Sequence, residues 1–218
     1  MKAIKINGIE IYVEESDRYV QVNDISEHDL KTVWESINRQ FPGYEFVFCF
    51  RNVAIPKDAL AEIGAEVLED CIYMQATKEG YIPAATAGVV PLEKADFPIF
   101  AQLHDKINPE VRQSRQIWDE WDRVWRIFVV KHDGAVTGYV MLNIAITGGD
   151  IGEIFAVVAE NHAQRMALIS AAVDYAFAAR KATVVYMVER DIVCEYKAAL
   201  ELGFRDIGFY IGYVVRGS

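Results

Sequence analysis

The sequence predicts an α/β protein in which a mixed sheet is flanked by helices and two related units stand in tandem. Two observations lead to this prediction. Over 152–215 the apolar runs EIFAVV, TVVYMV and IGFYIGYVV are separated by two segments of helical period. In addition, sliding the sequence by 139 positions, the separation of Gly64 and Gly203, aligns its first eighty residues with this region without gaps.

The N-terminal region is expected to begin with a hairpin, a strand and a helix. The segment IKINGIEIYV carries Asn7 and Gly8 at its centre, a dipeptide that favours the two-residue turn of a β-hairpin. The run RYVQV over 18–22 predicts a third strand, and the apolar spacing predicts a helix over 27–40. Ser26 precedes this helix and is a residue type that caps helix N-termini.

The repeat covers the elements that follow. Three pairs of segments align: helix 30–40 with 169–179, strand 45–50 with 184–189, and helix 57–64 with 196–203. Gly64 and Gly203 end the aligned helices, where a left-handed residue is favoured. We therefore predict that residues 1–78 form an incomplete, structural copy of the unit in 79–218. The loop 23–27 has two acids and no glycine, which would repel a phosphate.

The segment 79–218 is predicted to open with a joint, two helices and a second hairpin. Glycine, proline and small residues over 78–88 mark the joint. The two helices divide near Pro109, a residue that favours the first turn of a helix. The run WRIFVVKHDGAVTGYVML over 125–142 then predicts a hairpin with Asp133 and Gly134 at its tip.

The order strand, helix, strand, helix, strand over 152–215, with LELGF at 200–204, resembles the back half of the GNAT family of acetyl-CoA-dependent N-acetyltransferases. The hairpin at 125–142 resembles the central hairpin of that family, so the resemblance covers Ala85 to Val215. It implies a GNAT-like mixed sheet flanked by helices, in tandem with the incomplete N-terminal unit. It also implies acetyl-CoA as co-substrate and a primary amine of a small molecule as acceptor.

The family holds the cofactor pyrophosphate with Arg/Gln-x-x-Gly-x-Gly/Ala at the start of a helix, where N–H groups and partial positive charge favour phosphate. Here His162 takes the first position, Arg165 replaces the first glycine, and only Ala167 fits the last small position. The cofactor loop is therefore degenerate. The resemblance assigns phosphate binding to Ala163, Gln164, Arg165, Met166 and Ala167, and contact with the pantetheine arm to Val157 and Val158.

The resemblance also implies two catalytic residues. Glu153 on the strand EIFAVV is the candidate general base, because half-burial in an apolar run would raise its pKa. The alternative is a strand-edge carboxylate that faces water or pairs with an arginine. Tyr196 is the candidate acid for the departing thiolate, although the family's tyrosine position is Ala199 here, three residues further along the same helix face. The alternative for Tyr196 is packing on the sheet, and Ile192 stands where the family has asparagine.

A set of tryptophans in the same unit follows helical spacing. Trp118, Trp121 and Trp125 lie at i, i+3 and i+7. This spacing favours a core stripe. The alternative is a wall of the acceptor pocket, where a cationic amine would lie against an aromatic face.

Composition limits the function classes further. The net charge of −10 argues against nucleic acid, which needs a basic footprint, and suits either simple solubility or a cationic amine substrate. No apolar run reaches the length of a membrane span, and the N-terminus lacks a signal-peptide pattern, so we expect a cytoplasmic protein without a membrane partner. The three cysteines and four histidines show no metal-ligand spacing, and we expect no metal.

Two functions from different classes follow from these patterns. The first is an acetyl-CoA-dependent N-acetyltransferase, which the complete order of strands and helices favours. The second is a catalytically degenerate GNAT-fold protein that binds a ligand or partner, which the loop, Ala199 and Ile192 favour. We predict the enzyme, and the sequence does not identify its acceptor amine.

Overall fold

The computed structural model describes residues 2–107, 113–121, 123–146 and 149–217, so the helix start predicted at Pro109 lies outside the described residues. No described helix is long and apolar enough to cross a bilayer. The elements, in chain order, are β1 (Lys2–Ile6), β2 (Ile9–Glu14), β3 (Tyr19–Asn23), α1 (Glu27–Gln40), β4 (Glu45–Arg51), α2 (Lys57–Glu62), β5 (Glu66–Thr77), β6 (Val89–Pro91), η1 (Lys94–Asp96), α3 (Phe97–Ile107), α4 (Ser114–Asp119), β7 (Trp125–His132), β8 (Ala135–Asn143), β9 (Ile151–Val158), α5 (His162–Ala178), β10 (Thr183–Glu189), α6 (Val193–Glu201) and β11 (Arg205–Arg216).

The chain folds into two compact units. Unit 1 comprises Met1–Ile72 and Gly208–Ser218, and unit 2 comprises Tyr73–Ile207. The long strands β5 and β11 therefore each contribute residues to both units. The predicted division of the chain into 1–78 and 79–218 follows the sequence repeat and stays a prediction. The compact units are grouped differently, because the last residues of the chain, from Gly208, belong to the same unit as the N-terminal residues.

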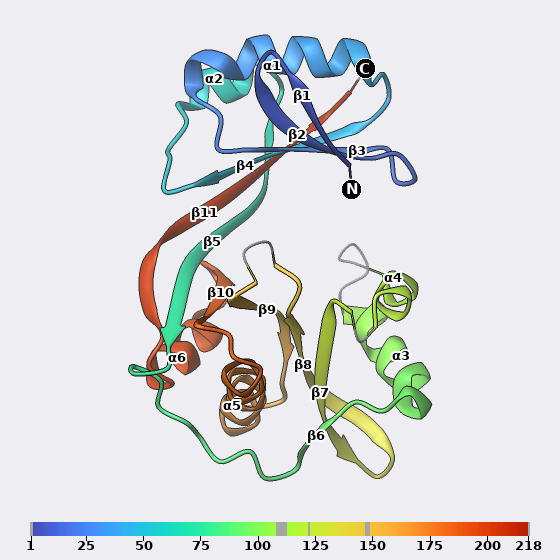
Figure 1. Ribbon diagram of the computed structural model, residues 1–218, viewed down its shortest axis with the longest axis vertical. Helices are drawn as coiled ribbons and strands as arrows, with labels where there is room; N and C mark the ends of the chain where they lie inside the picture. The colour runs from blue at the N-terminus through green and yellow to red at the C-terminus, as the bar shows by residue number, and fades with distance from the viewer. Residues whose placement is uncertain (1, 108–112, 122, 147–148, 218) are drawn as a thin grey trace. The chain divides into compact units, whose positions relative to one another are not determined.

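Unit 1 is a sheet with α1 and α2 over one face (Figure 1). Its strand order is β1-β2-β3-β4-β11, in which β3 and β4 are parallel and the other neighbours are antiparallel. Asn7 and Gly8 have positive φ angles at the tip of the β1–β2 hairpin. The Oγ atom of Ser26 accepts a hydrogen bond from the backbone N–H of Asp29 at 3.3 Å. The predicted hairpin and helix cap are thus confirmed.

Unit 2 is a sheet with helices on both faces. Its strand order is β5-β10-β9-β8-β7-β6, with β9 and β10 parallel and β8 antiparallel to β7 and β9. On one face the ring of Phe100 in α3 lies 5.0 Å from that of Tyr139, and on the other Tyr175 in α5 lies 5.7 Å from Phe128. The sheet is therefore enclosed between α5 and α3 (Figure 1).

The predicted repeat is visible in the element boundaries. Shifting the bounds of β5 by 139 gives 205 and 216, which are the bounds of β11. Gly64 and Gly203 follow α2 and α6 with φ angles of 69° and 83°, so both take the left-handed conformation expected at these ends. The predicted class, α/β with a mixed sheet flanked by helices, is confirmed.

Candidate functional site

Strand β9 carries an irregularity in the middle of unit 2. Met141 of β8 lies opposite Ala156, whereas the next residue, Leu142, lies opposite Ile154. Phe155 is therefore an extra residue on β9, a β-bulge of the kind that redirects a strand next to functional sites.

The pairing of β9 with β10 ends at this bulge. The parallel pairs run from Ile151 with Thr183 to Ile154 with Tyr186, and in the described strands no later residue of β9 pairs with β10. Val157 and Val158 still pair with β8 on their other side. Their outward backbone groups are available to an extended ligand that would add to the sheet as a strand does.

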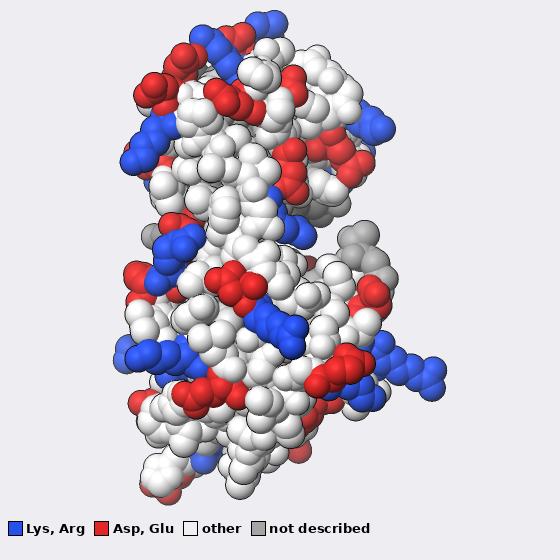
Figure 2. All heavy atoms as spheres, turned by 90° about the vertical axis from the view of Figure 1, so that its left-hand side faces the viewer, with Lys and Arg blue, Asp and Glu red and all other residues white. Residues whose placement is uncertain are grey.

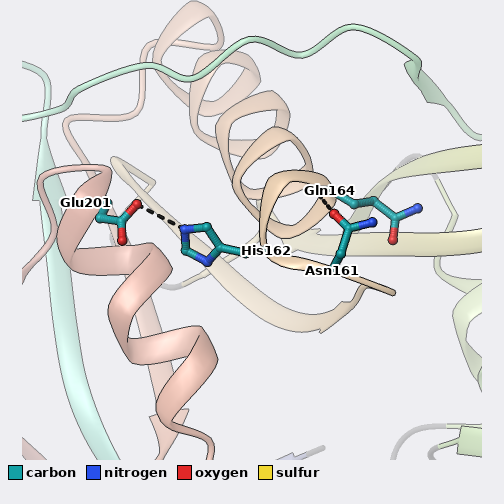
Figure 3. A network of polar contacts seen from close by, with 4 residues as sticks. All are labelled: Asn161, His162, Gln164 and Glu201. Carbon is teal, nitrogen blue, oxygen red and sulfur yellow. Dashed lines mark hydrogen bonds and ion pairs between the residues drawn. The ribbon is translucent and has the colours of Figure 1, made fainter.

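The first turn of α5 lies just beyond the end of β9 and is capped by its own residues. The Oδ1 atom of Asn161 accepts a hydrogen bond from the backbone N–H of Gln164 at 2.9 Å (Figure 3). The Oε1 atom of Gln164 in turn accepts one from the backbone N–H of Glu160 at 2.6 Å. The N–H groups of His162 and Ala163 bond no group in the described part of the chain. These two donors are the ones left for an anion.

His162 occupies the place that the resemblance gives to a phosphate-binding Arg or Gln, but it turns toward α6. Its Nε2 atom lies 3.0 Å from Oε2 of Glu201, and Figure 3 shows the imidazole and the side chain of Gln164 pointing in opposite directions. Both members of the pair are about half exposed, at 50% and 57%. His162 therefore links the start of α5 to the end of α6.

Arg165 turns inward, to a polar cluster that the sequence did not predict. Tyr186 is 1% exposed, and its hydroxyl donates to the carboxylate of Glu195 in the first turn of α6. Arg165 is close enough to lower the pKa of both groups, and its buried Nε atom has no hydrogen-bond partner among the described residues. Because Tyr186 is the last residue of β10 that pairs with β9, this cluster lies where the two strands part. The tyrosine within TVVYMV was the available signal.

Burial determines the titration of this cluster. Desolvation raises the pKa of Tyr186 well above its ordinary value, and the Glu195 carboxylate raises it further. Desolvation also raises the pKa of Glu195, against the opposing effects of the Tyr186 hydroxyl and the Arg165 charge. The folded state therefore favours the protonated carboxyl of Glu195 more than the unfolded state does.

We expect Glu195→Gln to stabilise the protein at alkaline pH. An acid whose pKa is raised by folding loses stability as pH rises from its unfolded pKa, about 4.3 for glutamate, through its folded value. Glutamine does not ionise and keeps an oxygen that accepts from Tyr186. The melting temperature should rise at pH 8, by about 2–4 °C per kcal/mol gained, and the gain should vanish at pH 4. A lower melting temperature at pH 8 would mean that Arg165 requires an ionised Glu195. The exposed Glu93→Gln is the matched control.

The two predicted catalytic residues occupy different elements. Glu153 lies on β9, where its Oε2 atom accepts a hydrogen bond at 3.3 Å from Nδ2 of Asn143 on β8. It is partly exposed, before the bulge and the parting of the strands. Tyr196 lies in α6 and is also partly exposed, and no described residue bonds its hydroxyl. No described contact joins Glu153 to Tyr196.

The remaining loop residues divide between surface and core. Ala163 is exposed, Met166 is partly buried, and Ala167 is buried against the sheet as its small size allows.

No three His, Cys, Asp or Glu side chains gather as metal ligands within the described ranges. Burial raises the pKa of the Cys49 thiol to about 11, which makes it a poor nucleophile at neutral pH.

No protein-family model matches the chain, and no curated protein matches it in sequence. Solved structures match it over almost its whole length. A conserved protein of unknown function from Staphylococcus epidermidis has a TM-score of 0.73 at 11% identity, covering 100% of this chain and 94% of that one. A GCN5-related N-acetyltransferase from Kribbella flavida has a TM-score of 0.70 at 12% identity, with coverages of 100% and 90%. A tandem GNAT protein from the clavulanic acid biosynthesis pathway has a TM-score of 0.61 at 14% identity, with coverages of 98% and 81%.

These matches establish the fold of the chain. At such low identity a shared fold does not by itself transfer an activity. The protein has the GNAT fold, so the resemblance drawn from residues 85–215 is confirmed and extends to the N-terminal region.

Proposed function

We propose that the protein is an N-acetyltransferase that moves an acetyl group from acetyl-CoA to a primary amine of a small molecule. The observation that carries the proposal is the parting of β9 and β10 beside the first turn of α5. This arrangement offers the backbone of Val157 and Val158, which among the described strands pairs with β8 but not with β10, next to helix N–H donors. An elongated ligand with an amide-containing arm and a phosphate end has the chemistry to fit both.

Each part of the site has a separate task in this proposal. Acetyl-CoA supplies the acetyl group as an activated thioester. Val157 and Val158 bind the pantetheine arm through their backbone, and the segment Ala163–Ala167 receives the pyrophosphate through the N–H of Ala163 and the side chain of Arg165. The inward guanidinium of Arg165, whose Nε atom bonds no group in the described part of the chain, would turn to the phosphates.

Glu153 and Tyr196 move the protons. Glu153 takes a proton from the acceptor ammonium, so that the nitrogen lone pair can form the N–C bond. The C–S bond breaks, Tyr196 gives its proton to the sulfur, and the second proton lost by the nitrogen returns to Tyr196 through solvent. The net change is one amide and one thiol formed from an amine and a thioester. Asn143 orients Glu153 through the hydrogen bond at 3.3 Å.

A second function, ligand or partner binding without catalysis, is favoured by the caps of α5. Asn161 and Gln164 already satisfy backbone N–H groups that a phosphate would otherwise bind, and Glu160 adds negative charge beside them. If these caps persist, the site is weak for an anion.

We do not propose nucleic acid as a substrate or partner of this protein. Figure 2 shows acidic and basic side chains mixed over one face, without a continuous basic field there. With a net charge of −10, the long-range attraction of the protein is for cations, which suits an amine.

Arg165→Glu tests the phosphate site. Calorimetric titration of the parent protein with coenzyme A should show binding, and the variant should bind about 10–100-fold more weakly, because a charge-assisted hydrogen bond contributes about 1.5–3 kcal/mol. Arg205→Glu makes the same charge change at an exposed position of β11 and should leave the affinity within about twofold.

The titration also separates the two functions. Absence of binding at millimolar coenzyme A would overturn the acetyltransferase and favour the binding protein. Tight binding that Arg165→Glu leaves unchanged would keep the function and place the phosphates elsewhere.

A further inference from the structure

A polar cluster between α5, α6 and β10 has no task in the reaction proposed above, apart from its arginine. Its members are Arg165 near the start of α5, Tyr186 on β10 and Glu195 in the first turn of α6. The Tyr186 hydroxyl donates to the Glu195 carboxylate. The Nε atom of Arg165 is buried and bonds no group within the described ranges. The cluster therefore combines a buried acceptor, a buried donor and an arginine with spare hydrogen-bonding capacity.

Helix geometry directs Arg165 toward α6. His162 lies three residues before Arg165, a spacing that places both side chains on one face of α5. On that face, Nε2 of His162 lies 3.0 Å from Oε2 of Glu201 in α6 (Figure 3). Because Arg165 shares this face and its Nε atom is buried, its side chain lies between the two helices and not in solvent. In this position its charge acts on the carboxylate of Glu195.

One guanidinium cannot serve both this cluster and a cofactor phosphate. In the proposed function the pyrophosphate lies beyond the N-terminus of α5, at the backbone N–H of Ala163. Arg165 can bind a phosphate there only after its side chain leaves the inward position. The Glu195 carboxylate and the phosphate are therefore competitors for the same arginine.

The departure of Arg165 leaves a negative charge without compensation. Burial raises the pKa of the Glu195 carboxyl, and the nearby charge of Glu189 on β10 raises it further. The Tyr186 hydroxyl and the Arg165 charge act in the opposite direction, and Cys194 of α6 faces Tyr186. Without the arginine the pKa of Glu195 rises again. The carboxylate then takes a proton from solvent, and the neutral acid still accepts from Tyr186.

We infer that Glu195 is a positioning residue that holds Arg165 away from the cofactor, and that coenzyme A binding replaces this interaction with a phosphate contact and a proton on Glu195. The inference rests on the proposed acetyltransferase function and concerns the regulation of its cofactor site. It makes the affinity for coenzyme A higher on the acid side, where Glu195 is already protonated and no longer holds the arginine.

Glu195→Gln tests the competition through a gain in affinity, which a merely structural residue would not give. In calorimetric titrations at pH 8, coenzyme A should bind the variant about tenfold more tightly than the parent, since an opposite charge shifts a carboxylate by about one pKa unit or more. The two affinities should converge as pH falls toward 5, because protonation removes the charge from Glu195 in the parent. Equal affinities at pH 8 would overturn the inference.

The matched control is Glu189→Gln. It removes a negative charge three residues after Tyr186, at an exposed position of β10. It should change the affinity for coenzyme A by less than about twofold, because an exposed charge is screened by solvent. A gain as large as that of Glu195→Gln would assign the effect to general charge and overturn the inference.

A double-mutant cycle connects the gain to Arg165. The comparison is repeated in the Arg165→Gln background, which has no guanidinium for the carboxylate to hold. Coenzyme A should bind this background more weakly than the parent, and adding Glu195→Gln should change the affinity by less than about twofold. A tenfold gain that persists without Arg165 would overturn the inference.

Proton uptake by the parent protein gives a measure that does not depend on how a variant folds. Dephospho-coenzyme A is the ligand, because its pyrophosphate is fully ionised at pH 7 and does not itself gain or lose a proton. Binding enthalpies in PIPES and imidazole buffers give the number of protons taken up. The parent should take up protons, and Glu195→Gln should take up fewer. No uptake by the parent, or equal uptake that leaves His162 as the group that titrates, would overturn the inference.

These outcomes are distinct from failure of the proposed function. Absence of binding in the parent and in every variant at millimolar coenzyme A would overturn the acetyltransferase and the inference together. Binding to the parent that responds neither to Glu195→Gln nor to pH would overturn the inference alone and leave the acetyltransferase in place.

Discussion

Replacing Gly203 with alanine should destabilise unit 2 by about 3 kcal/mol, because two separate penalties combine there. Its φ angle of 83° lies in the left-handed region, which L residues other than glycine adopt only with strain. A Cβ atom at this position would also lie 2.0 Å from the carbonyl oxygen of Gly80. The neighbouring segment cannot move away easily, since the backbone N–H of Ile82 donates to the carbonyl of Leu202 at 3.0 Å.

The repeat provides a matched control for this substitution. Gly64 occupies the equivalent position after α2, with a φ angle of 69°, but a Cβ atom added there would meet no neighbouring atom within 4 Å. Gly64→Ala should therefore cost only the conformational penalty, about 1 kcal/mol. Hydrogen exchange over α6 reports on the unit of Gly203, and exchange over α1 reports on the unit of Gly64. Equal losses in both variants would contradict the close approach of Gly80.

Local patterns were sufficient to predict most elements of this fold. The hairpin tips at Asn7 and Asp133, both left-handed, follow from turn chemistry that acts over a few residues. The periods of the repeat predicted that a strand follows each of the helices ended by Gly64 and Gly203. The sequence did not indicate that β5 and β11 each belong to both units, because this depends on pairing between distant strands and no local period encodes it.

The candidate site was predicted less completely, for a similar reason. Glu153 was placed correctly on its strand by the pattern EIFAVV. The inward turn of Arg165 depends on Tyr186 and Glu195, which are brought to it only by the packing of α5, α6 and β10. The bulge at Phe155 is a shift in register with β8, and the alternation of apolar residues along a single strand does not show it.

The largest functional effect is expected for Glu153→Gln, once an acceptor amine is in hand. Glutamine retains an oxygen that accepts from Asn143 but cannot take a proton from the acceptor. General-base catalysis contributes about 10²–10⁴-fold, so kcat should fall by this factor while the affinity for coenzyme A changes little. Glu93→Gln removes the same charge at an exposed site and should retain the parent rate.

Tyr196→Phe completes this prediction by separating the acid from the base. If Tyr196 protonates the departing thiolate, the variant should have a lower kcat for thiol release, with little change in the affinity for coenzyme A. Full activity in both variants would show that neither side chain moves a proton in the rate-limiting step. Catalysis would then depend on positioning by the parted strands and on backbone N–H groups at the developing oxyanion, with water as the proton carrier.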